Sequence, residues 1–147
     1  MMIRKFIFIA VLFVLYPWVP AANAELVVVV SATSGIEKLS RDEVIDVFMG
    51  RTRKFPNGMH AMPVDISNQH PEKAMFYQTL IGRELAEVNS YWARLRFSGQ
   101  GTPPLQADNT DEIIRLVADN KGAIGYIERK KLDRRLKLVY ALNPATQ

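Results

Sequence analysis

The sequence predicts an α/β fold in which a mostly parallel sheet is covered by helices on both faces. Two observations support this. Short runs rich in valine and isoleucine alternate along the chain with amphipathic helical segments, and this alternation is typical of parallel sheets. The first run, Glu25–Ser31, is almost continuously β-branched, which favours a strand buried on both faces in a parallel sheet. The chain has no cysteine, so packing alone must hold the core.

The first residues have the layout of a secretory signal peptide. Arg4 and Lys5 precede an apolar run, Phe6–Tyr16, and Ala22-Asn23-Ala24 provides the small residues that a signal peptidase accepts. The run is shorter than the roughly 20 residues that a membrane-spanning helix needs. We therefore predict cleavage after Ala24, and the alternative is an uncleaved membrane anchor.

Residues 25–147 are then expected to form a single domain, since this length suffices for one hydrophobic core. The leader contains two basic and no acidic residues, so its removal lowers the formal charge from +4 to +2. This charge and the predicted export argue against a nucleic-acid partner. Without a cysteine to carry a lipid, the processed protein is expected in the periplasm of a Gram-negative cell, with no membrane insertion.

Four helices are predicted from apolar spacing and capping residues. Ser40 with Glu43 forms a capping box, and Asn109 with Glu112 forms a second candidate. Pro71 suits the first turn of a helix, and Gly50 and Gly82 suit helix ends. The predicted helices span residues 39–50, 71–82, 84–96 and 109–120.

The remaining elements are strands and loops. Strands are predicted at residues 62–66, 122–127 and 136–142, and a glycine- and proline-rich loop at residues 98–104. Gly122 and Gly125 indicate close backbone packing, with a functional role as the alternative. Tyr91 and Trp92 are assigned to the core by helical spacing, whereas Tyr126 suits either the core or a cleft.

Four segments in order suggest a family. Residues 39–51 read LSRDEVIDVFMGR, a turn follows at residues 56–58, Tyr91 and Trp92 form a pair, and residues 120–126 read NKGAIGY. Together they resemble landmarks of phosphate-type ABC transporter periplasmic substrate-binding proteins. The resemblance implies a type II periplasmic-binding-protein-like fold, and the chain length implies a single lobe of it.

One departure from that family concerns its phosphate motif. The resemblance implies a serine, a glycine and a threonine before the helix that contains Phe76, where hydroxyls and backbone N–H groups hold the phosphate. Here these positions fall on His70, Pro71 and Glu72. Proline has no N–H to donate, and Glu72 and Asp65 are expected to repel an anion.

The predicted ligand site is the loop Ser67, Asn68, Gln69 and His70, because ligands of open α/β sheets bind at the carboxyl ends of strands. Turn and capping chemistry is the alternative explanation for these residues. Ser31, Thr33, Asn109 and Thr110 are expected at the same edge of the sheet.

Two basic clusters suit either a solvated surface or attraction of anions, acidic lipid or an acidic partner. They comprise Arg51, Arg53 and Lys54, and Arg129, Lys130, Lys131, Arg134 and Arg135. His60 and His70 are the only histidines, and no zinc spacing or nucleophile elbow occurs. We predict no enzyme, no catalytic residues, no metal site and no cofactor.

The sequence therefore predicts a periplasmic solute-binding protein with a degenerate phosphate motif. Its ligand is expected to be phosphate or another oxyanion, bound weakly unless an ABC permease, a sensor protein or a second copy completes the site. The alternative is a periplasmic adaptor or sensory module that binds a protein partner through the same surface and no small ligand.

Overall fold

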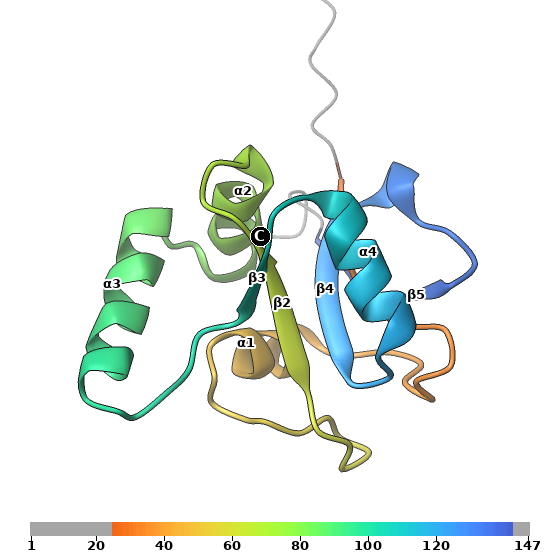
Figure 1. The fold of residues 1–147 in the computed structure, drawn as a ribbon, viewed down its shortest axis with the longest axis horizontal. Coiled ribbons are helices and arrows are strands. Elements are labelled where there is room, and N and C mark those ends of the chain that lie inside the picture. The colour runs from red at the N-terminus through yellow and green to blue at the C-terminus, as the bar shows by residue number, and fades with distance from the viewer. Residues whose placement is uncertain (1–24, 143–147) are drawn as a thin grey trace, which may run out of the picture.

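The computed structural model describes residues 25–142, which form one five-stranded sheet and the helices around it (Figure 1). The predicted signal peptide lies outside the described residues. In chain order the elements are β1 (Leu26–Ser31), α1 (Arg41–Phe48), β2 (Met62–Ile66), α2 (Pro71–Ile81), α3 (Leu85–Phe97), β3 (Leu105–Ala107), α4 (Thr110–Asp119), β4 (Ala123–Glu128), the 3-10 turn η1 (Arg129–Lys131) and β5 (Leu136–Ala141).

The sheet is mostly parallel, as predicted, but one strand, β1, runs against the others. The strand order is β3-β2-β4-β1-β5, with β2 parallel to both β3 and β4. β1 runs antiparallel to β4 and to β5. Four strands therefore share one direction and β1 alone opposes them. The prediction that β1 lies within a parallel sheet is wrong, although all six of its residues are buried as expected.

Helices cover both faces of the sheet, and β4 shows how. A Cβ on Gly125 would lie 2.7 Å from Ile113 and 3.2 Å from Val117, so this face of β4 packs directly on α4. The next residue, Tyr126, points to the other face, because side chains alternate along a strand. There its ring stacks on Phe76 of α2 at 3.8 Å.

The local signals for helix ends are confirmed. Ser40 and Glu43 make both hydrogen bonds of a capping box at the start of α1. Asn109 accepts from the Glu112 backbone N–H at 2.9 Å, but the Glu112 carboxylate bonds the Asp108 N–H instead of completing a box. Gly82 ends α2 in the left-handed conformation that lets the chain leave the helix.

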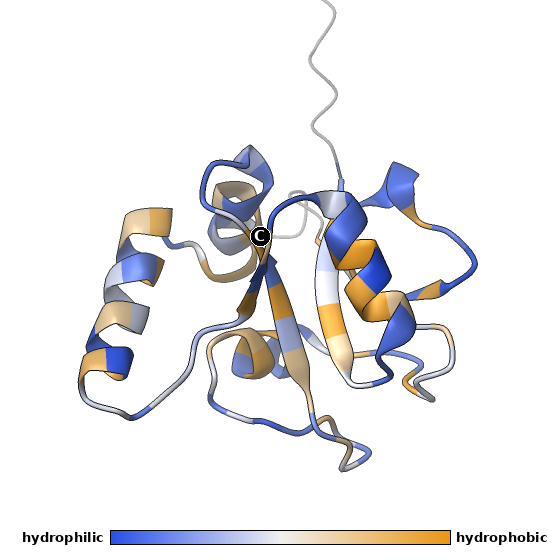
Figure 2. Ribbon diagram, viewed as in Figure 1, coloured by the Kyte–Doolittle hydropathy of each residue, from blue (hydrophilic) through white to orange (hydrophobic). Residues whose placement is uncertain are grey.

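Packing on α4 and on α3 differs sharply. α4 alternates apolar and polar residues around its axis and buries Ile113, Ile114 and Val117 against the sheet (Figure 2). α3 buries only Val88 and Trp92, and in Figure 1 it stands apart from the sheet. Cavities therefore flank α3. No helix within residues 25–142 has the length and apolar character needed to cross a lipid bilayer.

Candidate functional site

The predicted site lies at the sheet edge where β2, β3 and β4 end. The backbone N–H of Ser67, directly after β2, donates to the Ala107 carbonyl at the end of β3. His70 Nε2 donates to the Asp108 carbonyl oxygen at 2.8 Å. These bonds bring the Ser67–His70 loop beside Asn109 and Thr110, as the sequence predicted. Asn68 and Gln69 are exposed between them.

Ser31 and Thr33 do not lie at this edge. Because β1 is antiparallel to β4, its last residues lie at the level where β2 and β4 begin, with Val30 opposite Ile124. Ser31 Oγ points toward the Ala118 carbonyl near the end of α4, at 3.5 Å, whereas Asn109 begins that helix. The expectation that these two groups share an edge is wrong, and the direction of β1 is the reason.

The helix N-termini at this edge do not favour an anion. His70, Pro71 and Glu72 begin α2, and the His70 side chain makes no capping hydrogen bond. Glu72 Oε2 is buried without a hydrogen-bond partner among the described residues. The start of α4 is already satisfied by Asn109 and Glu112. At the start of each helix a glutamate carboxylate lies close to the backbone N–H groups. Neither helix start therefore favours an anionic ligand.

A polar cluster lies beneath the edge. Asp65 is 3% exposed in the middle of β2. Its carboxylate accepts hydrogen bonds from the hydroxyls of Tyr126 and of Tyr77, the latter at 2.6 Å. Lys73 is also 3% exposed, and its Nζ lies 3.7 Å from Asp65 Oδ2. Three buried polar side chains from α2 and β4 thus meet around one carboxylate on β2.

Burial dominates the electrostatics of this cluster. It raises the pKa of Asp65 above its ordinary value, and the charge of Lys73 and the tyrosine hydrogen bonds offset this only in part. Burial and the neighbouring carboxylate also raise the pKa of Tyr77 and Tyr126, so both hydroxyls stay protonated and can donate.

A dependence of stability on pH follows from the raised pKa of Asp65. The folded state binds this proton more tightly than the unfolded state, whose carboxyl titrates near 3.8, so the stability that protonation adds is present at low pH and is lost as pH rises. We expect the free energy of unfolding of the wild type, relative to Asp65→Asn, to fall as the pH rises above about 4, where the unfolded carboxyl ionises. Urea unfolding at a series of pH values measures it. A constant or rising difference contradicts the prediction.

A cavity opens next to the cluster, between the start of α2, one side of α3 and β3. We call it the α3 cavity; its volume is about 320 Å³. The polar side chains that line it are Asp65, Asn68, Lys73, Asn89, Arg96 and Gln106. Trp92 also lines it, and its indole N–H is buried without a partner among the described residues. The cavity thus gathers two cations, one carboxylate, three amides and an unused donor.

Only Asn68 of the predicted site residues lines this cavity, and the rest of its polar lining was not predicted. The sequence did contain signals for two of these residues. Lys73 shares a helical stripe with Phe76, Tyr77 and Leu80, where an apolar residue is expected. Asp65 interrupts the apolar run of β2 between Val64 and Ile66. A charge at an inward position is costly unless it is paired, so each marked a buried polar site.

Comparison with solved structures supports the family resemblance at the level of the fold. The chain is similar to an ABC-type phosphate transport receptor from Vibrio cholerae (17% identity, TM-score 0.63, 78% of this chain and 45% of that one). It is also similar to a phosphate ABC transporter substrate-binding protein with bound phosphate from Clostridium perfringens (15%, 0.62, 78% and 44%) and to PstS from Borrelia burgdorferi (11%, 0.60, 79% and 46%).

No protein-family model and no curated protein matches the sequence. The chain spans less than half the length of each of these three solved structures. The predicted single-lobe architecture agrees with this coverage, and residues 25–142 have the fold of one part of a phosphate-type ABC transporter substrate-binding protein.

Proposed function

We propose that this protein is an exported, non-catalytic binding domain of the periplasm that holds a small oxyanion in the α3 cavity. Buried Lys73 carries the proposal. A lysine ammonium has three N–H donors. Within residues 25–142 its one ion-pair partner is Asp65, at a distance longer than a hydrogen bond. The side chain lines the cavity, so its remaining donors are available to a ligand there.

The other lining groups suit the same ligand. Arg96 adds a second cation from α3, and the side-chain amides of Asn68, Asn89 and Gln106 supply further donors. Asp65, which also lines the cavity, can accept a hydrogen bond from the hydroxyl of a partly protonated anion such as hydrogen phosphate. A volume of about 320 Å³ is at the lower end for ligand pockets, which suits phosphate, sulfate or a short carboxylate with bound water.

The ligand position proposed here differs from the one implied by the family motif. Pro71 and Glu72 make the start of α2 a poor anion site, whereas Lys73, one residue further along, faces the cavity. In this proposal Asn68 contacts the ligand. Ser67, Gln69, His70, Asn109 and Thr110 form the rim against which a second wall closes, and Ser31 and Thr33 lie too far away to contribute.

The second wall has to come from outside the described domain. A ligand pocket normally buries most of its ligand, and one lobe leaves much of it exposed. We propose that a second copy of the chain, an ABC permease or a sensor protein supplies this wall, after removal of residues 1–24 as a signal peptide. Affinity of the isolated protein is then low, and millimolar ligand is needed to observe binding.

Thermal unfolding with phosphate, sulfate and short carboxylates tests the proposal. A ligand at 100 times its dissociation constant adds about 2.7 kcal/mol, which raises the Tm of a domain of this size by several degrees. We expect one anion to produce a saturable shift that Arg96→Ala and Asn68→Ala abolish. Arg94→Ala is the matched control, because Arg94 lies on the same helix but does not line the cavity. No saturable shift, or equal loss with Arg94→Ala, contradicts oxyanion binding.

An adaptor that binds a protein through this same edge is the alternative. The helix starts favour it, because α4 is already capped by Asn109 and α2 begins with Pro71 and Glu72. A surface without free anion donors can still dock a partner. Two results together support the adaptor. The wild type shows no Tm shift with any anion, and a protein partner binds it but no longer binds when Gln69 and Asn109 are replaced by alanine.

A further inference from the structure

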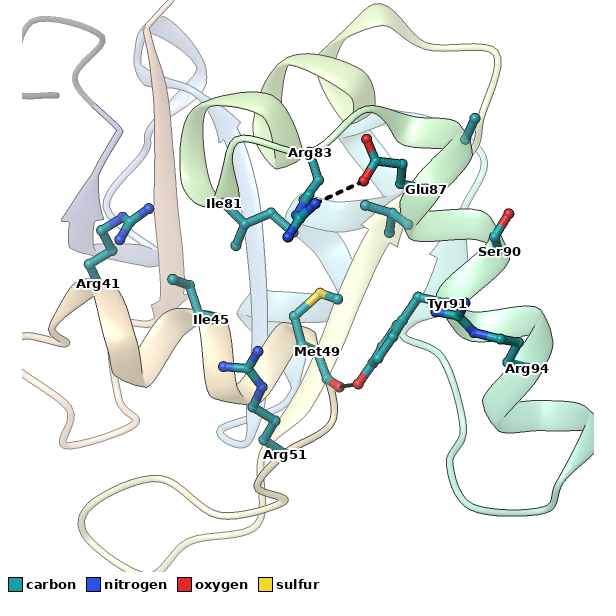
Figure 3. Close-up of a pocket in the computed structure, with 12 residues that line it drawn as sticks. Arg41, Ile45, Met49, Arg51, Ile81, Arg83, Glu87, Ser90, Tyr91 and Arg94 are labelled. Atoms are coloured by element: carbon teal, nitrogen blue, oxygen red, sulfur yellow. Dashed lines mark hydrogen bonds and ion pairs between the residues drawn. The ribbon is translucent and has the colours of Figure 1, made fainter.

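Four arginines surround a second, larger cavity on the opposite side of α3. This groove lies between α1, the end of α2 and α3, and its volume is about 770 Å³ (Figure 3). Arg41, Arg51, Arg83 and Arg94 line it. Val88 is the one residue that lines both this arginine groove and the α3 cavity. The two sites are therefore separated by the thickness of one helix.

The floor of the arginine groove is apolar and is held in place. It is formed by Ile45 of α1, Met49 directly after α1, Ile81 of α2, and Val88 and Tyr91 of α3. The Tyr91 hydroxyl donates to the Met49 carbonyl at 2.7 Å, which ties α3 to the end of α1. Figure 3 shows Met49 and Tyr91 meeting across the groove with arginines on both sides.

The positive charge of the groove is only partly neutralised. Glu87 is the one acidic residue among those that line it, and it pairs with Arg83 at 3.2 Å. Arg51 pairs at 3.4 Å with Asp46, which lies outside the lining, and both of these side chains are largely exposed. Arg41 donates to the Leu80 carbonyl at 2.5 Å, an uncharged partner. The Arg94 guanidinium has no hydrogen bond or ion pair with residues 25–142, whereas its backbone carbonyl is bonded to Ser98. The groove therefore favours a ligand that brings several negative charges.

An exposed aromatic side chain extends the same surface. Phe97 is 96% exposed, which is unusual for a residue of its size. It follows Ser90 and Arg94 at helical spacing, so it continues the face of α3 that lines the groove. Arginine and aromatic residues are enriched at protein interfaces and among the side chains that dominate their energetics.

We propose that the arginine groove and Phe97 bind an acidic, amphipathic segment of a partner protein. Apolar side chains of the segment pack on the floor, and its carboxylates pair with Arg51, Arg94 and the other arginines. Phosphate alone would leave an apolar floor uncovered. Residues 1–24 and 143–147 contain no aspartate or glutamate, so they do not supply such an acidic segment. This site is separate from the solute site proposed above.

The test measures binding of two fluorescein-labelled peptides composed of glutamate and leucine, one with alternating spacing and one with helical spacing. Fluorescence anisotropy with the full protein is expected to show saturable binding of one of them and none of its glutamine counterpart. We expect Arg51→Glu with Arg94→Glu to weaken the Kd at least about tenfold, because each charge reversal places like charges in contact. Phe97→Ser is expected to weaken it as well.

The matched control is Arg53→Glu with Arg96→Glu, which makes the same charge change two residues further along the same two segments. Neither of these arginines lines the groove. The control is expected to bind the peptide and to lose the Tm shift that the anion produces. The groove variant is expected to keep that Tm shift and to lose peptide binding. Each proposal can therefore fail alone.

Several results would overturn the proposal. They are no saturable binding of either peptide, equal binding of the glutamine peptide, and equal weakening by the control. Binding to phosphatidylglycerol vesicles without peptide binding would assign the arginines to a lipid surface instead. Self-association that depends on Arg94 without peptide binding would assign the groove to a second copy of the chain.

Discussion

Replacement of Asp65 by alanine is expected to lower the free energy of unfolding by about 3–5 kcal/mol. Asp65 is the one acidic group within ion-pair distance of buried Lys73 in residues 25–142, and it accepts from the hydroxyls of Tyr77 and Tyr126. Its removal leaves a buried ammonium without a counterion and two buried donors without an acceptor, and each unsatisfied hydroxyl costs about 1–3 kcal/mol. Urea unfolding at neutral pH, followed by far-UV circular dichroism, measures the loss.

A double variant separates the charge from the loss of packing. Adding Lys73→Met to Asp65→Ala removes the stranded ammonium and keeps a side chain of similar length. We expect the added Lys73→Met change to raise the free energy of unfolding of Asp65→Ala by at least about 1 kcal/mol, because it removes the unpaired charge. Such a result is non-additive, as is usual for residues in contact. A cost below about 1 kcal/mol for Asp65→Ala, or a further loss on adding Lys73→Met, contradicts the assignment of Asp65 as the centre of the cluster.

Phe76→Ala is expected to cost about 3–5 kcal/mol, since it empties a well-packed core position. Phe76 is fully buried, with its ring stacked on Tyr126 at 3.8 Å and edge-on to Phe48 at 4.9 Å. It therefore joins α1, α2 and β4 at one point. The midpoint of urea unfolding is the measurement.

The chain contains its own control for this prediction. Phe97→Ala removes the same atoms from a side chain that is 96% exposed, so we expect its effect on stability to stay within about 0.5 kcal/mol. Similar losses for both variants would contradict the packing described for α2. A selective loss for Phe76 leaves Phe97 available as a pure binding variant for the arginine groove.

Helix ends and strand positions could be predicted because their signals are local. The Ser40–Glu43 capping box, Pro71 at the start of α2 and Gly82 at its end act within one helical turn. The predicted close packing at Gly125 is confirmed by α4, whose side chains leave no room for a Cβ. β3 was not predicted: it has three residues, two of them exposed, and therefore no readable periodicity.

The direction of β1 could not be predicted, because a strand that is buried on both faces has the same apolar pattern whether its neighbours are parallel or antiparallel. Because the direction of β1 was taken as parallel, Ser31 and Thr33 were predicted at the wrong edge of the sheet, opposite the edge where they lie. The loop after β2 and the start of α4 were placed together correctly, since β2 and β3 do run in parallel; that the loop binds a ligand stays a prediction.

By itself, the sequence determined the α/β class, the positions of the predicted elements and the departure from the phosphate motif at residues 70–72. Only the tertiary structure decided which charges act together. Helical geometry predicts that Arg94 and Arg96 point in different directions, about 200° apart around α3. The cavity that each arginine faces depends on α1, α2 and β3, which are distant in the sequence and pack against α3 only when the whole chain is folded.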